Sequence, residues 1–131
     1  MTTPVPYSEG AYGVKMDPSV KQLWMDELRN GNRKQAQRYL NTGEAQCCLG
    51  VLCELAIEQG LDIKAESYTP YEKADPLITY DGSAAVLPTA VMAWSGIIHD
   101  NGAYGRNNAL SMDNDQGKTF AEIADIIEKE F

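Results

Sequence analysis

The most constraining part of the sequence is the segment 46–57, QCCLGVLCELAI, which holds all three cysteines and the densest apolar run. Its apolar residues recur at a spacing that places them on one face of a helix: Leu49, Leu52, Cys53, Ala56 and Ile57. The dipeptide Gln59-Gly60 predicts the end of that helix, because glycine adopts the left-handed cap conformation at little steric cost. We therefore expect a strand that ends near Cys48 and leads directly into a buried helix over residues 50–59.

Size and charge favour one domain that binds neither membranes nor nucleic acids. The chain has 131 residues, of which 44% are hydrophobic, enough for a core without disulfides. Its net charge of -8 repels nucleic-acid phosphates unless a local basic patch overrides it. No apolar run approaches the roughly 20 residues that span a bilayer, and we expect no secretory signal, because residues 1–16 lack a charged region followed by an apolar one.

The three cysteines predict buried free thiols. Cys47 and Cys48 are adjacent, so in a strand their side chains point to opposite faces and a disulfide between them is strained. The spacing CC-x4-C with His99 as the single histidine lacks the paired pattern of a zinc site. We therefore expect no metal and no cofactor. The alternative is a zinc site or a thiol nucleophile built from Cys47 or Cys48, Cys53 and His99.

The first part of the chain predicts an arm followed by a helix. Residues 1–16 contain prolines and glycines without periodicity, so we expect a flexible arm there and a single domain over residues 17–131. Asp17 is a good N-cap, and Pro18 suits the first helical position. An apolar stripe follows before Asn30-Gly31 ends the helix.

Two hairpins are expected between the helices. Residues 35–40 and 44–48 flank the first turn, and residues 77–80 and 84–87 flank Asp81-Gly82, which permits the positive φ angles of a type I′ turn. Residues 61–75 fit either a short strand or a loop. The predicted fold is α+β, with a small antiparallel sheet of two hairpins packed by three to four helices.

The C-terminal third predicts two more helices. Residues 88–95 form a short helix that Gly96 ends, and residues 97–108 fit a loop or a short edge strand. Thr119 and Glu122 form a capping box at the start of the last helix. The preceding segment DNDQG, residues 113–117, resembles a calcium loop, but its glycine and glutamate registers fail, so we interpret it as a turn.

A basic cluster is the candidate binding site. Arg29, Arg33, Lys34 and Arg38 supply four of the eleven basic residues within ten positions, and Lys21 can join them. Guanidinium forks bind phosphates and carboxylates, so the sequence predicts an anion patch, with a solvated basic face as the alternative. Exposed tyrosines provide contact area at low entropic cost, so those in the predicted loops are candidates for a binding surface, with ordinary half-buried packing as the alternative.

Four motifs in order resemble a family of small uncharacterised proteins of tailed bacteriophages and prophages. They are LWMDELRNG at 23–31, CCLGVLCELA at 47–56, LP with WSG at 87–96, and NDQGKTFAEIADIIE at 114–128. The resemblance implies a phage origin and the cytoplasm of a bacterial host as the location. It supplies no catalytic residues.

Binding is the function that the sequence favours. The chain has no recognisable nucleophile–base spacing and no glycine-rich phosphate loop. The hypothesis is a phage-encoded accessory protein, not an enzyme, that acts on the host. It would counter host defence by sequestering a small anionic, nucleotide-like ligand or by binding a host protein. The alternatives are a cysteine- or zinc-dependent enzyme and a minor component of virion assembly.

Overall fold

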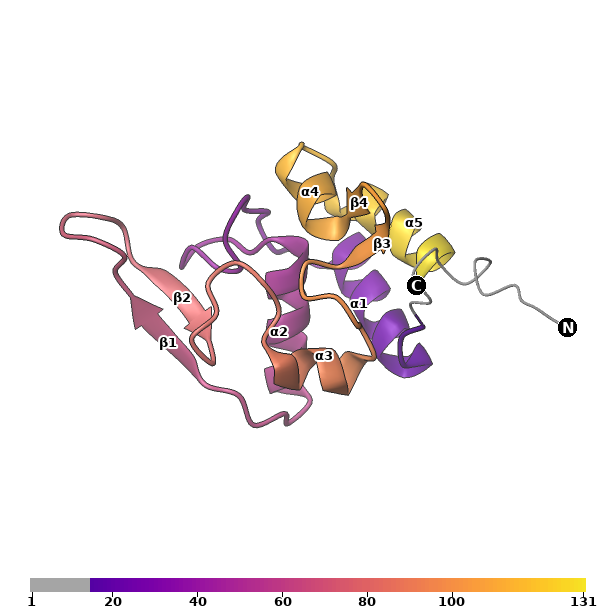
Figure 1. Ribbon diagram of the computed structural model, residues 1–131, viewed down its shortest axis with the longest axis horizontal. Coiled ribbons are helices and arrows are strands. Elements are labelled where there is room, and N and C mark those ends of the chain that lie inside the picture. The colour runs from indigo at the N-terminus through magenta and orange to yellow at the C-terminus, as the bar shows by residue number, and fades with distance from the viewer. Residues whose placement is uncertain (1–14) are drawn as a thin grey trace, which may run out of the picture.

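The computed structural model describes residues 15–131 and confirms the α+β prediction (Figure 1). Its helices are α1 (Pro18–Asn30), α2 (Cys48–Glu58), α3 (Thr89–Ser95), α4 (Leu110–Asp115) and α5 (Phe120–Glu130). Its strands are β1 (Ala65–Tyr68), β2 (Leu77–Tyr80), β3 (Ala103–Gly105) and β4 (Asn108–Ala109), which form two antiparallel two-stranded sheets. Residues 1–14 of the expected arm lie outside the described residues, whereas Met16 is buried in the core.

Helix α2 forms the centre of the core. In Figure 1 it lies between α1 and the ribbon made by β1 and β2. Every residue from Cys48 to Ala56 except Glu54 is buried, so the helix is enclosed on more than the single face that the spacing predicted. The Trp24 indole on α1 donates to the Cys48 carbonyl at 3.0 Å. The expected strand before α2 is wrong, because the helix begins at Cys48 and its N-cap is Cys47.

The predicted ends of α1 and α5 are confirmed by their caps. Asp17 Oδ1 accepts hydrogen bonds from the backbone N–H groups of Ser19 and Val20 at 2.9 and 3.2 Å. Hydrogen bonds from the Ser19 hydroxyl and these amides lower the pKa of Asp17. At α5, Thr119 and Glu122 form the expected reciprocal capping box. Local side-chain chemistry therefore sets where both helices begin.

The first expected hairpin is wrong. Residues 35–47 form an irregular loop with only isolated bridges, which join Gln35 and Asn41 to Gln46. Arg38 has a positive φ of 75°, which turns the chain out of the extended conformation. Side chains from α4 take the place of a strand partner, since the Arg38 amide donates to Asp115 Oδ1 at 2.7 Å and the Ala36 carbonyl accepts from Asn114.

The second expected hairpin is correct in its first strand and its turn, but its second strand is wrong. Asp81 and Gly82 have φ angles of 50° and 84°, as a type I′ turn requires. Only Ser83 then pairs back to Tyr80. The partner of β2 is β1, in the register Ala65↔Tyr80 to Tyr68↔Leu77. All four side chains of β1 are exposed, so no apolar alternation marked it in the sequence.

The remaining elements also contribute buried residues to the core, from α3, β4, α4 and α5. Helix α3 ends at Gly96, whose φ of 85° is the left-handed conformation that glycine favours. Residues 97–108, which fitted either a loop or a short edge strand, contain β3, and β3 pairs with β4. Helix α4 occupies most of the segment that was interpreted as a turn, and α1 packs against α5. None of the described helices has the length and apolar character that crossing a bilayer requires.

Candidate functional site

The two arginines at the start of the predicted anion patch are held by carboxylates. Arg29 donates to Asp125 at 2.8 Å and to Glu128 at 2.7 Å, both on α5. These hydrogen bonds raise the pKa of Arg29. Its guanidinium therefore ties α1 to α5 on a solvated surface, where such ion pairs contribute little to stability.

Arg33 is held in the same way on a different part of the surface. It donates to Glu27 of α1 and to Glu58 at the end of α2, both at 2.9 Å. Burial lowers the pKa of Arg33, but the hydrogen bonds to Glu58 and Glu27 outweigh burial and raise it. The guanidinium groups of Arg29 and Arg33 thus have four carboxylate partners on three helices, and an anion would have to displace these carboxylates.

The other residues of the basic cluster are more open. Lys34 and Arg38 are exposed on the loop between α1 and α2. Neither side chain forms an ion pair with any residue in the range 15–131. Lys21 donates its ammonium to the Glu128 carbonyl at 3.2 Å. The anion patch stays a prediction, and its open charges are those of Lys34 and Arg38.

The cysteines lie inside the core as free thiols. Burial raises the pKa of all three, so each is protonated at neutral pH. A protonated, enclosed thiol is a poor nucleophile and a poor metal ligand. Among residues 15–131, no three His, Cys, Asp or Glu side chains are grouped as a metal site requires.

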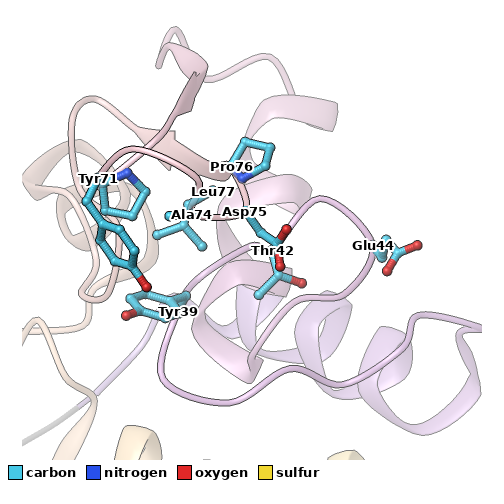
Figure 2. A pocket seen from close by; sticks show the side chains of 9 residues that line it. Tyr39, Thr42, Glu44, Tyr71, Ala74, Asp75, Pro76 and Leu77 are labelled. Atoms are coloured by element: carbon cyan, nitrogen blue, oxygen red, sulfur yellow. The ribbon is translucent and has the colours of Figure 1, made fainter.

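A cleft of about 560 Å³ lies between the loop 39–44 and residues 70–77, which lead from β1 into the start of β2 (Figure 2). Its polar lining consists of Tyr39, Thr42, Glu44, Tyr71 and Asp75. Its apolar lining consists of Pro70, Ala74, Pro76 and Leu77. Tyr71 reaches toward Tyr39 at one end, and Asp75 lies next to Thr42. The exposed fractions of Tyr71 and Tyr39 are 71% and 39%.

A buried hydrogen-bond network fixes the loop 39–44 against the sheet. The Ile78 amide of β2 donates to the Asn41 carbonyl at 2.9 Å. The Asn41 side-chain amide donates to the Tyr80 hydroxyl at 2.8 Å, and that hydroxyl donates to the Glu54 carboxylate of α2. Burial and the bond to Glu54 raise the pKa of Tyr80. The cleft wall is thus anchored to the core, which favours a preformed site.

The charge of the cleft is opposite to that of the predicted patch. Glu44 and Asp75 are exposed, and neither carboxylate forms a hydrogen bond or ion pair with another residue of 15–131. The lining contains no lysine, arginine or histidine. Tyrosine ring faces are also electronegative. The cleft therefore favours a cationic group over an anionic one.

The sequence signalled only part of this cleft. Tyr71 lies in the segment 61–75, for which a loop was one of the two interpretations, whereas Tyr39 lies in the expected strand 35–40, and Glu44 and Asp75 were not predicted. The two walls meet because β1 pairs with β2 and because Asn41 binds Ile78. Neither contact has a local sequence signature, so the sequence did not show that Glu44 and Asp75 line the same cleft.

The family model described as a domain of unknown function, DUF8296, matches residues 16–131. The chain belongs to the DUF8296 family. No curated protein and no solved structure matches it. All nine described helices and strands lie within the matched range, so the cleft is formed entirely by the DUF8296 domain.

Proposed function

We propose that this DUF8296 protein is a binding protein, not an enzyme, and that it contacts a host protein through the cleft between residues 39–44 and 70–77. The observation that carries the proposal is the pair of exposed tyrosines, Tyr39 and Tyr71, on the two walls of an anchored cleft. Tyrosine is enriched at energetically dominant positions of protein interfaces, because it adds a large rigid surface with few rotatable bonds.

The biological setting of the proposal comes from the sequence. The four motifs that resemble proteins of tailed phages support a phage-encoded accessory role in the cytoplasm of a bacterial host. Counteracting host defence is the form of that role that we propose. The raised pKa values of the buried cysteine thiols argue against a cysteine-dependent enzyme.

The test of the proposed contact site is photo-cross-linking. With p-benzoylphenylalanine at position 71, we expect a discrete cross-link to a host protein, because this side chain projects from the cleft wall. The same group at Met112, an exposed position on α4 outside the cleft, should give no such product. Excess wild-type protein should compete the product away.

Competition by variants gives the matched control. Excess Tyr39→Ser protein should compete poorly, whereas Tyr68→Ser should compete like wild type, because Tyr68 is 51% exposed but lies outside the cleft lining. Equal cross-linking from positions 71 and 112, or equal competition by both variants, would contradict the proposed site.

The small-anion form of the hypothesis makes a separate prediction. Because Arg29 and Arg33 are each held by two carboxylates, we expect a panel of linear and cyclic nucleotides to shift the melting temperature by less than about 1 °C. Ligand binding at 100 times Kd would add about 2.7 kcal/mol and produce a clear rise. A rise that Lys34→Ala with Arg38→Ala abolishes would favour nucleotide sequestration instead.

A further inference from the structure

We propose that the cleft binds a basic side chain of the partner, preferentially arginine, between its two tyrosines and its two carboxylates. The inference rests on the proposed function for the existence of a partner. It adds the chemical class of the group that the cleft recognises.

The first argument is that the two carboxylates of the cleft, those of Glu44 and Asp75, have no ion-pair partner among residues 15–131. Most acidic groups near the helices are engaged: Glu27 and Glu58 bind Arg33, and Asp125 and Glu128 bind Arg29. Glu44 and Asp75 line the cleft without such a partner among residues 15–131. Negative charge focused in a concave site attracts a cation and repels an anion.

The second argument, independent of the first, is the pair of aromatic rings. Tyr39 and Tyr71 approach each other at one end of the cleft, and Asp75 lies toward the middle (Figure 2). A cation over a tyrosine face is attracted by the ring quadrupole. The rings and the carboxylates therefore favour the same charge in the cleft.

The third argument is the apolar lining. Pro70, Ala74, Pro76 and Leu77 provide a surface for an aliphatic stem, and long basic side chains bury their methylenes while their charged heads stay solvated. Arginine fits better than lysine, because its planar guanidinium stacks on aromatic rings and donates in parallel to a carboxylate. Thr42 adds a hydroxyl beside Asp75.

The experiment is a set of NMR titrations with three short capped peptides that differ at one residue. The first peptide carries arginine, the second its neutral isostere citrulline and the third glutamate. The ring signals of Tyr39 and Tyr71, assigned with Tyr→Phe variants, report on the cleft. We expect saturable shifts with the arginine peptide and binding at least about tenfold weaker with citrulline. Raising the salt from about 0.05 to 0.5 M should weaken the arginine complex.

Isosteric variants test the carboxylates. Asp75→Asn should lower the affinity for the arginine peptide by about tenfold, and Glu44→Gln should lower it by a smaller factor. Glu72→Gln is the matched control, since Glu72 is exposed on the same connection but does not line the cleft. An unchanged melting temperature shows that each variant is folded.

The outcomes separate this inference from the proposed function. Equal binding of the arginine and citrulline peptides, no effect of Asp75→Asn, or no saturable shift with any peptide would overturn the cation site. If position 71 still cross-links specifically to a host protein, the binding function stands and only the ligand class is wrong. If that cross-link is also absent, the proposed function fails as well.

Discussion

Replacing Gly50 by alanine is expected to destabilise the protein by about 2 kcal/mol or more, although the site lies inside a helix. In an ordinary helix this change would stabilise by about 1 kcal/mol, since alanine has the higher helix propensity. At Gly50, however, a Cβ would lie 1.7 Å from the Leu40 carbonyl oxygen. The steric clash therefore outweighs the gain in helix propensity, so the substitution lowers the stability of the protein and does not raise it.

The Leu40 backbone has little freedom to move away. Its carbonyl accepts from the Cys47 amide at 3.2 Å, and its amide donates to the Ala84 carbonyl at 2.8 Å. Thermal unfolding should show a loss of about 6 °C or more for Gly50→Ala, at about 3 °C per kcal/mol for a domain of this size.

Gly43→Ala is the matched control for this prediction. Its φ is +93°, but a Cβ there meets nothing within 4 Å. The expected cost is about 1–2 kcal/mol, from the left-handed backbone alone. If Gly50→Ala raised the melting temperature instead, the close crossing of the loop over α2 would be refuted.

The helices whose ends carry local signals could be predicted from sequence. Asp17 with Pro18, and Thr119 with Glu122, act within a few residues of the chain, and each pair forms the cap that its pattern indicates. Helix α4 escaped prediction because it has six residues and no side-chain cap. Too few positions were available for an apolar period to emerge.

The strands depend on contacts that the local sequence does not show. Asp81-Gly82 specified its turn, yet it did not specify what the residues after the turn would bind. The Ala84 carbonyl accepts from Leu40, and the Leu87 amide donates to the Asp100 carbonyl. Residues 84–87 are therefore held by distant segments, and β2 pairs with the polar strand β1.

The candidate site also combines features that the local sequence shows with contacts that it does not show. The basic cluster is compact in sequence, but Asp125 and Glu128, which hold Arg29, follow it by almost a hundred positions. The cleft instead joins two segments that no motif connects, and of its two tyrosines only Tyr71 lay in a segment for which a loop was expected as one alternative. The residue types in the sequence predicted a binding surface. Which charged side chains are left without an ion-pair partner, however, depends on contacts between distant segments.

Replacing Asn114 by alanine is the second change with a large expected effect, a loss of about 3 kcal/mol or more. Asn114 is fully buried. Its Oδ1 accepts from the Cys48 amide at 3.1 Å and from the Gln35 side chain at 2.9 Å, and its Nδ2 donates to the Ala36 carbonyl at 2.7 Å. Alanine would leave the Cys48 amide and the Ala36 carbonyl buried without these partners.

The loss should reach the cleft because of where these partners lie. Cys48 begins α2, whose N-cap residue makes no side-chain cap bond, so Asn114 supplies from α4 the acceptor that the helix start lacks. Gln35 and Ala36 belong to the loop that carries Tyr39, Thr42 and Glu44 into the cleft. Without Asn114, Gln35 and Ala36 lose their hydrogen bonds to α4, and the bond from the Arg38 amide to Asp115 is left to attach this loop to that helix.

Thermal unfolding should therefore show a decrease of about 9 °C or more for Asn114→Ala, with faster hydrogen exchange at the Ala36 amide, which donates to the Gln46 carbonyl at 2.8 Å. Asn107→Ala, at an exposed position before β4, should change stability by less than about 0.5 kcal/mol. If Asn114→Ala and Asn107→Ala had the same melting temperature, or if hydrogen exchange at the Ala36 amide stayed slow, Asn114 would not be what holds the loop. The cleft wall would then be held by its other hydrogen bonds, among them those from the Arg38 amide to Asp115 and from Asn41 to Tyr80.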